Sequence, residues 1–191
     1  MTATYFTNPL VFLVQTLFGL YITIVVIRFL LQWAGADFYN PLSQFIVKAT
    51  SPLLRPLRRV VPGYRGLDVA SLVLAWLLKS VELMILAPLF GLGLQFIGPF
   101  AWAVPDLVGL VISIFLFMVL IRVVLSWVNP DPYNPAVAIL TRLTDPLLLP
   151  AQRILPPMGG IDLSPMLVMI ALVLLQMLLI PPLRWVTGSP F

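Results

Sequence analysis

The sequence contains no cysteine and no histidine. The absence of both residue types excludes disulfide bonds, thiol nucleophiles, thiolate or imidazole metal ligands and the commonest general base. The sequence also contains no Gly-Lys-Ser/Thr phosphate loop, no Gly-x-Ser-x-Gly nucleophile elbow and no His-Glu-x-x-His zinc motif. We therefore expect a protein that is not an enzyme and that uses no metal or other cofactor.

Charged residues are scarce as well. They make up 9% of the chain, against about 25% in soluble domains, whereas hydrophobic residues make up 61% and the mean hydropathy is +1.06. A soluble fold could not bury that much apolar surface, so the composition indicates an integral membrane protein. The net charge of +4 could suggest nucleic acid, but the basic residues gather beside expected membrane spans, so no direct nucleic-acid partner is expected.

Four apolar runs are long enough to cross a bilayer, whose hydrocarbon core of about 30 Å requires roughly 20 helical residues. They are Pro9 to Trp33, Val69 to Phe90, Pro105 to Val128 and Leu163 to Trp185. No Lys or Arg precedes the first run, and that run is too long for the core of a signal peptide, so we interpret it as a retained span. The predicted fold class is an all-α membrane protein with four transmembrane helices.

The chain is an internal duplication, because it matches itself without a gap at an offset of 94 positions. The first copy covers residues 1–94 and the second covers residues 95–191. Each copy contains two spans, so both must cross the membrane in the same sense, as two tandem parallel repeats. We interpret the matched motif residues as structural: Arg28, Trp33, Asp37, Tyr39, Asn40, Pro41 and Asp68 in the first copy, and Arg122, Trp127, Asp131, Tyr133, Asn134, Pro135 and Asp162 in the second.

The basic residues predict the orientation of the chain. The connectors between paired spans carry Lys48, Arg55, Arg58, Arg59, Arg65, Arg142 and Arg153, whereas the opposite face carries only Arg184. By the positive-inside rule, the connectors are expected to be cytoplasmic and both termini periplasmic. Lys48, Arg55, Arg58, Arg59, Arg142 and Arg153 are the candidates for contact with anionic phospholipids or a protein partner.

Each connector also predicts short helices lying at the membrane interface. Asn40 before Pro41, and Asn134 before Pro135, are favourable helix starts because Asn caps free amides and Pro suits the first helical position. The apolar residues that follow in the first connector recur at helical spacing: Leu42, Phe45, Ile46, Ala49 and Leu53. Pro52 and Pro146 predict a bend and a second short helix from Ser51 and Asp145. The alternative is a tight turn packed on the ends of the spans.

Several charged residues lie within or next to the spans. Arg28 and Arg122 lie just inside the boundary, where they can extend to the headgroups, pair with Asp68 or Asp162, or contact a phospholipid or a partner. Both aspartates are otherwise expected to cap the following helix.

Lys79 and Glu82 lie near the middle of the second span, at a spacing that lets them form an ion pair on one helix face. Such a pair is either structural or a functional site. Val173 and Gln176 occupy the matching positions of the second copy, so the pair is not repeated.

The repeated pattern resembles the YggT family. It comprises Arg-x-x-x-x-Trp, Asp-x-Tyr-Asn-Pro, Thr-x-Pro-Leu-Leu-x-Pro, Arg-x-x-Pro and Gly-x-Asp, and both copies carry it. The second copy departs where Leu149 replaces Arg55 and Gln152 replaces Arg58. The resemblance implies a multi-pass protein of the bacterial inner membrane, related to proteins associated with osmotic stress, potassium homeostasis, division and cofactor assembly.

Two functions are consistent with these observations. The first is a non-enzymatic accessory protein, a scaffold or assembly factor at the cytoplasmic leaflet that acts in a stress or osmotic response. The second is a small oligomeric ion transport or channel component in which Lys79 and Glu82 line the path. The expected partners are anionic phospholipids at the cytoplasmic face and either a second copy of the chain or other membrane proteins.

Overall fold

The computed structural model describes all residues except 1, 64–65, 129–130, 132–133 and 156–161, and it describes residues 2–7 by their backbone only. The described residues form six α-helices and no strand. In chain order the helices are α1 (Thr2–Trp33), α2 (Pro41–Arg58), α3 (Val69–Leu89), α4 (Gly98–Val128), α5 (Pro135–Ile154) and α6 (Ser164–Thr187).

Four of these helices are long and apolar enough to cross a membrane, which confirms the predicted fold class. The candidate spans are Asn8–Trp33, Val69–Leu89, Gly98–Val128 and Ser164–Thr187. The third begins at Gly98, seven residues before the predicted start at Pro105, because Pro99 suits the first turn and α4 runs on through Pro105 as an interior proline. The other three agree with the expected runs to within two residues at their span ends.

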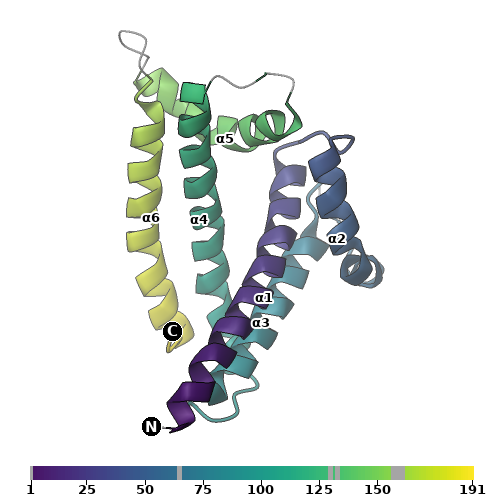
Figure 1. The fold of residues 1–191 in the computed structure, drawn as a ribbon, viewed down its shortest axis with the longest axis vertical. Coiled ribbons are helices and arrows are strands. Elements are labelled where there is room, and N and C mark those ends of the chain that lie inside the picture. The colour runs from purple at the N-terminus through teal and green to yellow at the C-terminus, as the bar shows by residue number, and fades with distance from the viewer. Residues whose placement is uncertain (1, 64–65, 129–130, 132–133, 156–161) are drawn as a thin grey trace.

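The spans form two pairs, one from each half of the chain. Helix α1 packs against α3, and α4 packs against α6, with α3 and α4 joining the pairs (Figure 1). Among the described residues α1 and α6 make no contact, so the four spans form an open row rather than a closed ring. The connector helices α2 and α5 lie at one end of the bundle and both termini lie at the other (Figure 1).

The main core lies between the spans and the connector helices. Its fully buried members include Val25 and Leu31 of α1, Leu54 of α2, Val119 of α4 and Leu143 of α5. The outward faces of the two outer spans are apolar and exposed, with Phe12, Leu20, Met177 and Leu178 exposed by 60% or more. Apolar patches of this extent require hydrocarbon around them.

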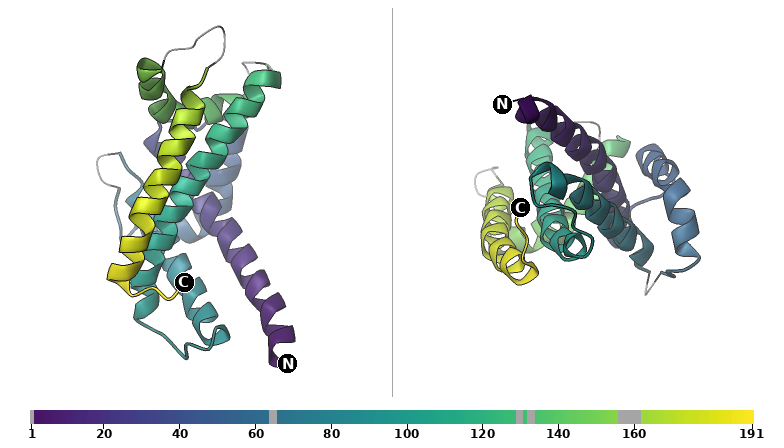
Figure 2. Two further views of the ribbon diagram at one scale, coloured as in Figure 1. Left: turned by 90° about the vertical axis from the view of Figure 1, so that its left-hand side faces the viewer. Right: turned by 90° about the horizontal axis from the view of Figure 1, so that it is seen from below.

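Each connector contains one helix rather than the predicted two. Helix α2 continues through Pro52 and Pro56, and α5 continues through Pro146 and Pro150, although both change direction along their length (Figures 1 and 2). Proline normally breaks a helix because it lacks an N–H and leaves carbonyls of the preceding turn without a partner.

Side chains donate hydrogen bonds to carbonyls about one turn before Pro52 and so hold that turn of α2 in helical form, which gives a physical reason for the continuity of the helix. The Thr50 hydroxyl donates to the Ile46 carbonyl at 2.7 Å, and the Ser51 hydroxyl donates to Val47. Arg28 of α1 also donates to Val47, at 3.0 Å.

Candidate functional site

The connector helices begin as the Asn-Pro pairs predict. The Asn40 side chain accepts a hydrogen bond from the Leu42 amide at 2.9 Å, and Asn134 accepts one from Ala136 at the same distance. Asn40 also donates from Nδ2 to the Pro135 carbonyl at 2.8 Å, which ties the first connector to the second. Pro41 and Pro135 occupy the first helical positions.

Arg28 joins the first span to its connector and to the next span. Its Nη1 donates to Thr50 Oγ1 at 2.6 Å and to the Val47 carbonyl, and its Nε lies 3.5 Å from the Asp68 carboxylate. The side chains of Arg28 and Asp68 are only 6% and 3% exposed. The predicted pairing of Arg28 with Asp68 is therefore present, and it links α1, α2 and the start of α3.

Asp68 does not cap α3 in the way that the sequence suggested. Its carboxylate makes no hydrogen bond to a backbone amide of α3. It accepts instead from the Ser71 hydroxyl at 2.6 Å and from the guanidinium of Arg58. Two nearby arginines attract the carboxylate away from the helix end because a charged donor binds it more strongly than an amide.

Asp68 is ionised more easily than a free carboxyl. Burial raises its pKa, but hydrogen bonds from Arg58 and Ser71 and the charges of Arg58 and Arg28 outweigh burial, so the pKa lies below its ordinary value.

Arg122 repeats this geometry in the second half, with a different anion. Its Nη1 donates to Thr144 Oγ1 at 2.6 Å, to the Thr141 carbonyl at 3.3 Å and to Asp145 Oδ1 at 2.6 Å. Asp145 stands where the first copy has Ser51, so here the anionic partner comes from the connector helix. The predicted pairing of Arg122 with Asp162 is not the one observed, because Asp145 follows Thr144 directly in the chain and its carboxylate reaches the same guanidinium nitrogen.

Asp162 does act as a cap. Its Oδ1 accepts the amide of Ser164 at 2.9 Å, and its Oδ2 accepts Nε2 of Gln152, also at 2.9 Å. Gln152 thus takes the place that Arg58 has in the first copy. Burial raises the pKa of Asp162, but the hydrogen bonds from Ser164 and Gln152 and the charge of Arg122 lower it below its ordinary value.

The other motif residues lie near the ends of the spans. Asp37 accepts the Tyr39 amide at 2.8 Å in a local turn, and the ring of Trp33 meets that of Phe115 edge-on at 6.1 Å between centroids. Trp127, by contrast, is 83% exposed. Asp131 is exposed, and Tyr133 lies outside the described residues.

The six basic connector residues proposed to contact lipid or a partner are exposed, and one of them, Arg58, is in an ion pair with a described residue. Lys48, Arg55, Arg59, Arg142 and Arg153 are all exposed, and no ion pair involves them within the described part of the chain. Arg58 differs because it pairs with Asp68. The six residues are therefore not one functional group: five lie on an open surface and Arg58 helps to hold α2 onto α3.

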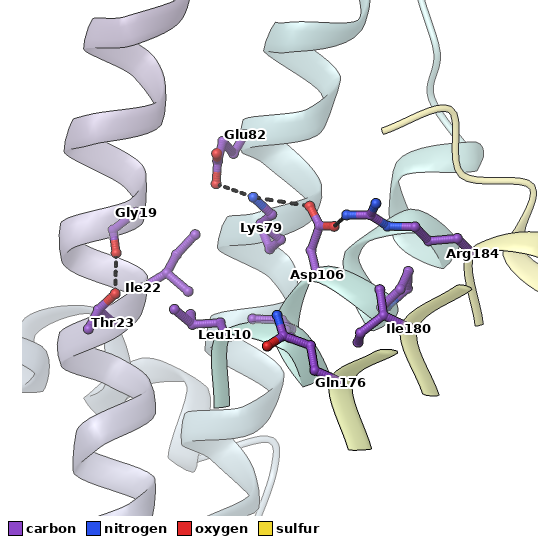
Figure 3. Close-up of a pocket in the computed structure, with 13 residues that line it drawn as sticks. Gly19, Ile22, Thr23, Lys79, Glu82, Asp106, Leu110, Gln176, Ile180 and Arg184 are labelled. Carbon is purple, nitrogen blue, oxygen red and sulfur yellow. Dashed lines mark hydrogen bonds and ion pairs between the residues drawn. The ribbon is translucent and has the colours of Figure 1, made fainter. Parts of the chain in front are cut away.

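A network of four charged side chains lies among the spans (Figure 3). Lys79 Nζ lies 3.1 Å from Glu82 and 3.3 Å from Asp106, and Asp106 in turn lies 3.7 Å from Arg184. These residues come from α3, α4 and α6, so the network joins the two halves of the chain. The Glu82 side chain is only 3% exposed, and two acids and two bases balance in charge.

The network lines a cavity of about 370 Å³ that all four spans border. Gly19, Ile22 and Thr23 of α1 form one side, and Gln176 and Ile180 of α6 form another (Figure 3). The predicted Lys79–Glu82 pair is present, but it is one part of a larger network.

No sequence pattern predicted a role for Asp106, and Arg184 was expected only on the membrane face opposite the connectors. An acidic residue next to the predicted start of an apolar span was the signal for Asp106. Phe12 and Phe90 occupy the positions that match Asp106 and Arg184 in the first copy, so none of the four charges is repeated.

No group of three or more Asp and Glu side chains able to hold a metal ion is found in the described part of the chain.

Comparison with known proteins agrees with the duplicated architecture. The CCB3/YggT family model matches twice, over residues 7–89 and residues 101–183. An uncharacterized protein of Pseudomonas aeruginosa is 46% identical over 185 residues, covering 94% of this chain and 92% of that protein. The uncharacterized YggT protein of Escherichia coli K12 is 40% identical over 172 residues, covering 89% and 88%.

A shorter match, to the ycf19 protein of Guillardia theta, is 44% identical over 57 residues, which is 29% of this chain and 63% of that protein. No solved structure matches the chain. Two family matches that together span most of the chain, each containing one connector and its pair of membrane helices, show that this protein belongs to the CCB3/YggT family.

Proposed function

We propose that the protein is a non-enzymatic scaffold or assembly factor of the bacterial inner membrane, whose connector helices lie in the cytoplasmic leaflet. The observation that carries this proposal is the surface of α2. It exposes the basic residues Lys48, Arg55 and Arg59 together with the apolar residues Leu42, Phe45 and Leu53. A helix that exposes both kinds of side chain at the end of a membrane bundle suits the boundary between headgroups and hydrocarbon.

The inward side of α2 supports the same proposal. Ser43, Thr50 and Leu54 are buried, and Arg28 holds the helix to the first span. Helix α2 is thus fixed in place, and its free basic residues are presented in a constant position. Each exposed Lys or Arg near an anionic leaflet contributes about 1 kcal/mol of attraction. Such a surface can organise anionic phospholipids or dock a protein with an acidic face.

Complementation of a deletion strain under hyperosmotic shock tests this proposal. The variant R55E/R59E reverses two exposed charges that make no ion pair with any described residue, so we expect normal membrane abundance and loss of complementation. Arg58 is left unchanged because its reversal would also break the pair with Asp68. Gln95→Glu, which alters the exposed linker between the two halves, is the control and should complement fully. Full complementation by R55E/R59E would refute the proposal.

A second candidate function, a small oligomeric ion transport or channel component, is favoured by the charge network around Lys79. Ionisable groups within a membrane are uncommon and often mark an ion path, and here they border a cavity. Purified protein in liposomes should then change the flux of potassium or protons, and K79M/E82Q should alter that flux. Flux equal to that of empty liposomes would exclude this function.

A further inference from the structure

The connector end of the second repeat contains a groove between α4, α5 and α6, with a volume of about 730 Å³. Arg122, Gln152 and Asp162 are among its polar lining residues, and Val123, Met166 and Met169 are among its apolar ones. Asp162 precedes α6, whereas Met169 lies five residues into it, or about 8 Å deeper along the span. The groove therefore has polar groups at the membrane boundary and apolar walls extending toward the hydrocarbon.

The matching place in the first repeat is closed. There Arg58 reaches Asp68, and Gln32 donates from Nε2 to the Gly66 carbonyl at 2.7 Å. The second repeat has the shorter residues Gln152 and Ser126 at those two positions. The Arg28 side chain is accordingly 6% exposed, whereas the Arg122 side chain is 27% exposed. Both shorter side chains line the groove.

Two charged groups of the groove have unused binding capacity: Arg122, which pairs with Asp145 through Nη1 alone, and Asp162. Within the described residues, all three hydrogen bonds of Arg122 leave from Nη1, so Nη2 and Nε have no protein acceptor. The partners of Asp162 are the Ser164 amide and the Gln152 side chain, both uncharged, and no cation pairs with it in that part of the chain. A ligand that carries both an anion and a hydrogen-bonding cation would complement the groove.

We propose that this groove binds the headgroup of one phosphatidylethanolamine molecule. The phosphate accepts from Nη2 and Nε of Arg122, which no described residue binds, the primary ammonium donates to Asp162, and the acyl chains follow the apolar walls into the bilayer. Phosphatidylcholine fits less well because its quaternary ammonium has no N–H to donate. Phosphatidylglycerol supplies no cation for Asp162. The inference is independent of the scaffold proposal, which concerns the surface of α2.

Native mass spectrometry of the full-length, delipidated protein tests the proposal directly. We expect one dioleoyl-phosphatidylethanolamine per chain, bound at least tenfold more tightly than dioleoyl-phosphatidylcholine or dioleoyl-phosphatidylglycerol. The variant S126Q/Q152R carries the residues of the first repeat at the two open positions. It should weaken phosphatidylethanolamine binding at least tenfold while keeping a donor to Asp162. Thermal unfolding of the variant checks that the fold is retained.

Two further variants separate headgroup recognition from a change in the fold. D162N removes the negative charge with little change of shape, so the preference for phosphatidylethanolamine over phosphatidylcholine should disappear. Q95R, like Q152R, replaces a glutamine by arginine, but in the linker between the two halves, so it should bind phosphatidylethanolamine as tightly as the wild type does. Equal affinity of the wild type for the three lipids would overturn the proposal. So would undiminished phosphatidylethanolamine binding by D162N, which decides the question even if S126Q/Q152R fails to fold.

Discussion

Arg28 of α1 donates a hydrogen bond of 2.6 Å to the hydroxyl of Thr50 in α2, and Arg122 makes the same bond of 2.6 Å to Thr144 in the second half. These arginines and threonines match each other in the duplication. Each bond fixes a connector helix to the span that precedes it. The guanidinium therefore has a defined structural role, in addition to any that it has toward lipid.

Replacing the two arginines should have unequal effects. We expect R28A to lower the free energy of unfolding by about 1.5–3 kcal/mol, because buried Thr50 and the Val47 carbonyl lose a charged donor while Asp68 keeps Arg58. R122A should lower the free energy of unfolding by less, because the Arg122 and Asp145 side chains are each more than a quarter exposed and water can solvate the groups that lose their partner. Thermal or denaturant unfolding in one detergent measures both. An equal or larger loss for R122A would contradict this account of burial.

Acidification should weaken the first repeat through Asp68. Its folded-state pKa is depressed, so its contribution to stability is complete above the unfolded value of about 3.9 and is lost as the pH falls through the folded pKa. The melting temperature of the wild type should therefore fall at acidic pH more than that of D68N, which has no carboxyl to protonate. D68N should already be less stable at pH 7. Parallel pH profiles for the two proteins would show that Asp68 makes no such contribution.

The charge network should respond more strongly to one substitution than to two. K79V leaves Glu82 buried without its cation, which typically costs about 3–5 kcal/mol. The double variant K79V/E82Q removes both charges and installs the residue types found at positions 173 and 176 in the second half. It should recover part of the lost stability in a double-mutant cycle, while Asp106 keeps Arg184. Additive losses would mean that Lys79 and Glu82 are not coupled.

The two asparagine caps offer a matched pair of substitutions. N134A removes one cap, which is expected to cost about 1 kcal/mol. N40A removes the equivalent cap and also the hydrogen bond to the Pro135 carbonyl, for about 1 kcal/mol more. Unfolding of both variants under one condition gives the difference. If the two lose the same amount, the link between the connectors does not contribute to stability.

The absence of cysteine makes the expected orientation simple to test. Single cysteines in place of Lys48 and Arg142 should both react with an impermeant reagent applied from the cytoplasmic side. A cysteine in place of Gln95 should react only from the periplasmic side. Labelling of positions 48 and 142 from opposite faces would contradict a parallel duplication.

Much of the architecture could be predicted because it depends on long-range composition. Runs of twenty apolar residues predicted the four helices, and the offset between Arg28 and Arg122 predicted the repeat. The early start of α4 could not be predicted from an apolar run, because its first turns lie around Gly98 and Pro99. The single helix of each connector was also missed. Pro52 normally ends a helix, and the turn before it is held in part by Arg28, a side chain from another helix whose position no local pattern reveals.

The candidate sites could be predicted in part. The spacing of Lys79 and Glu82 was enough to predict their pairing, since both lie on one helix. Their link to Asp106 depends on how α3 packs against α4, which no local pattern encodes. Asp145 stands where the first copy has Ser51, and the role of its carboxylate likewise depends on its hydrogen bond with Arg122, which lies on another helix.

The attachment of α2 to the first span has a mechanical consequence. Arg28 donates hydrogen bonds to Val47 and Thr50 in the middle of α2. A force that acts on α2 is therefore transmitted directly to α1 and does not depend on the covalent connection through residues 34–40. Through Asp68 the same force reaches the start of α3. A molecule that binds the outer surface of α2 and displaces it therefore also displaces α1 and α3, because the Arg28 guanidinium links all three segments.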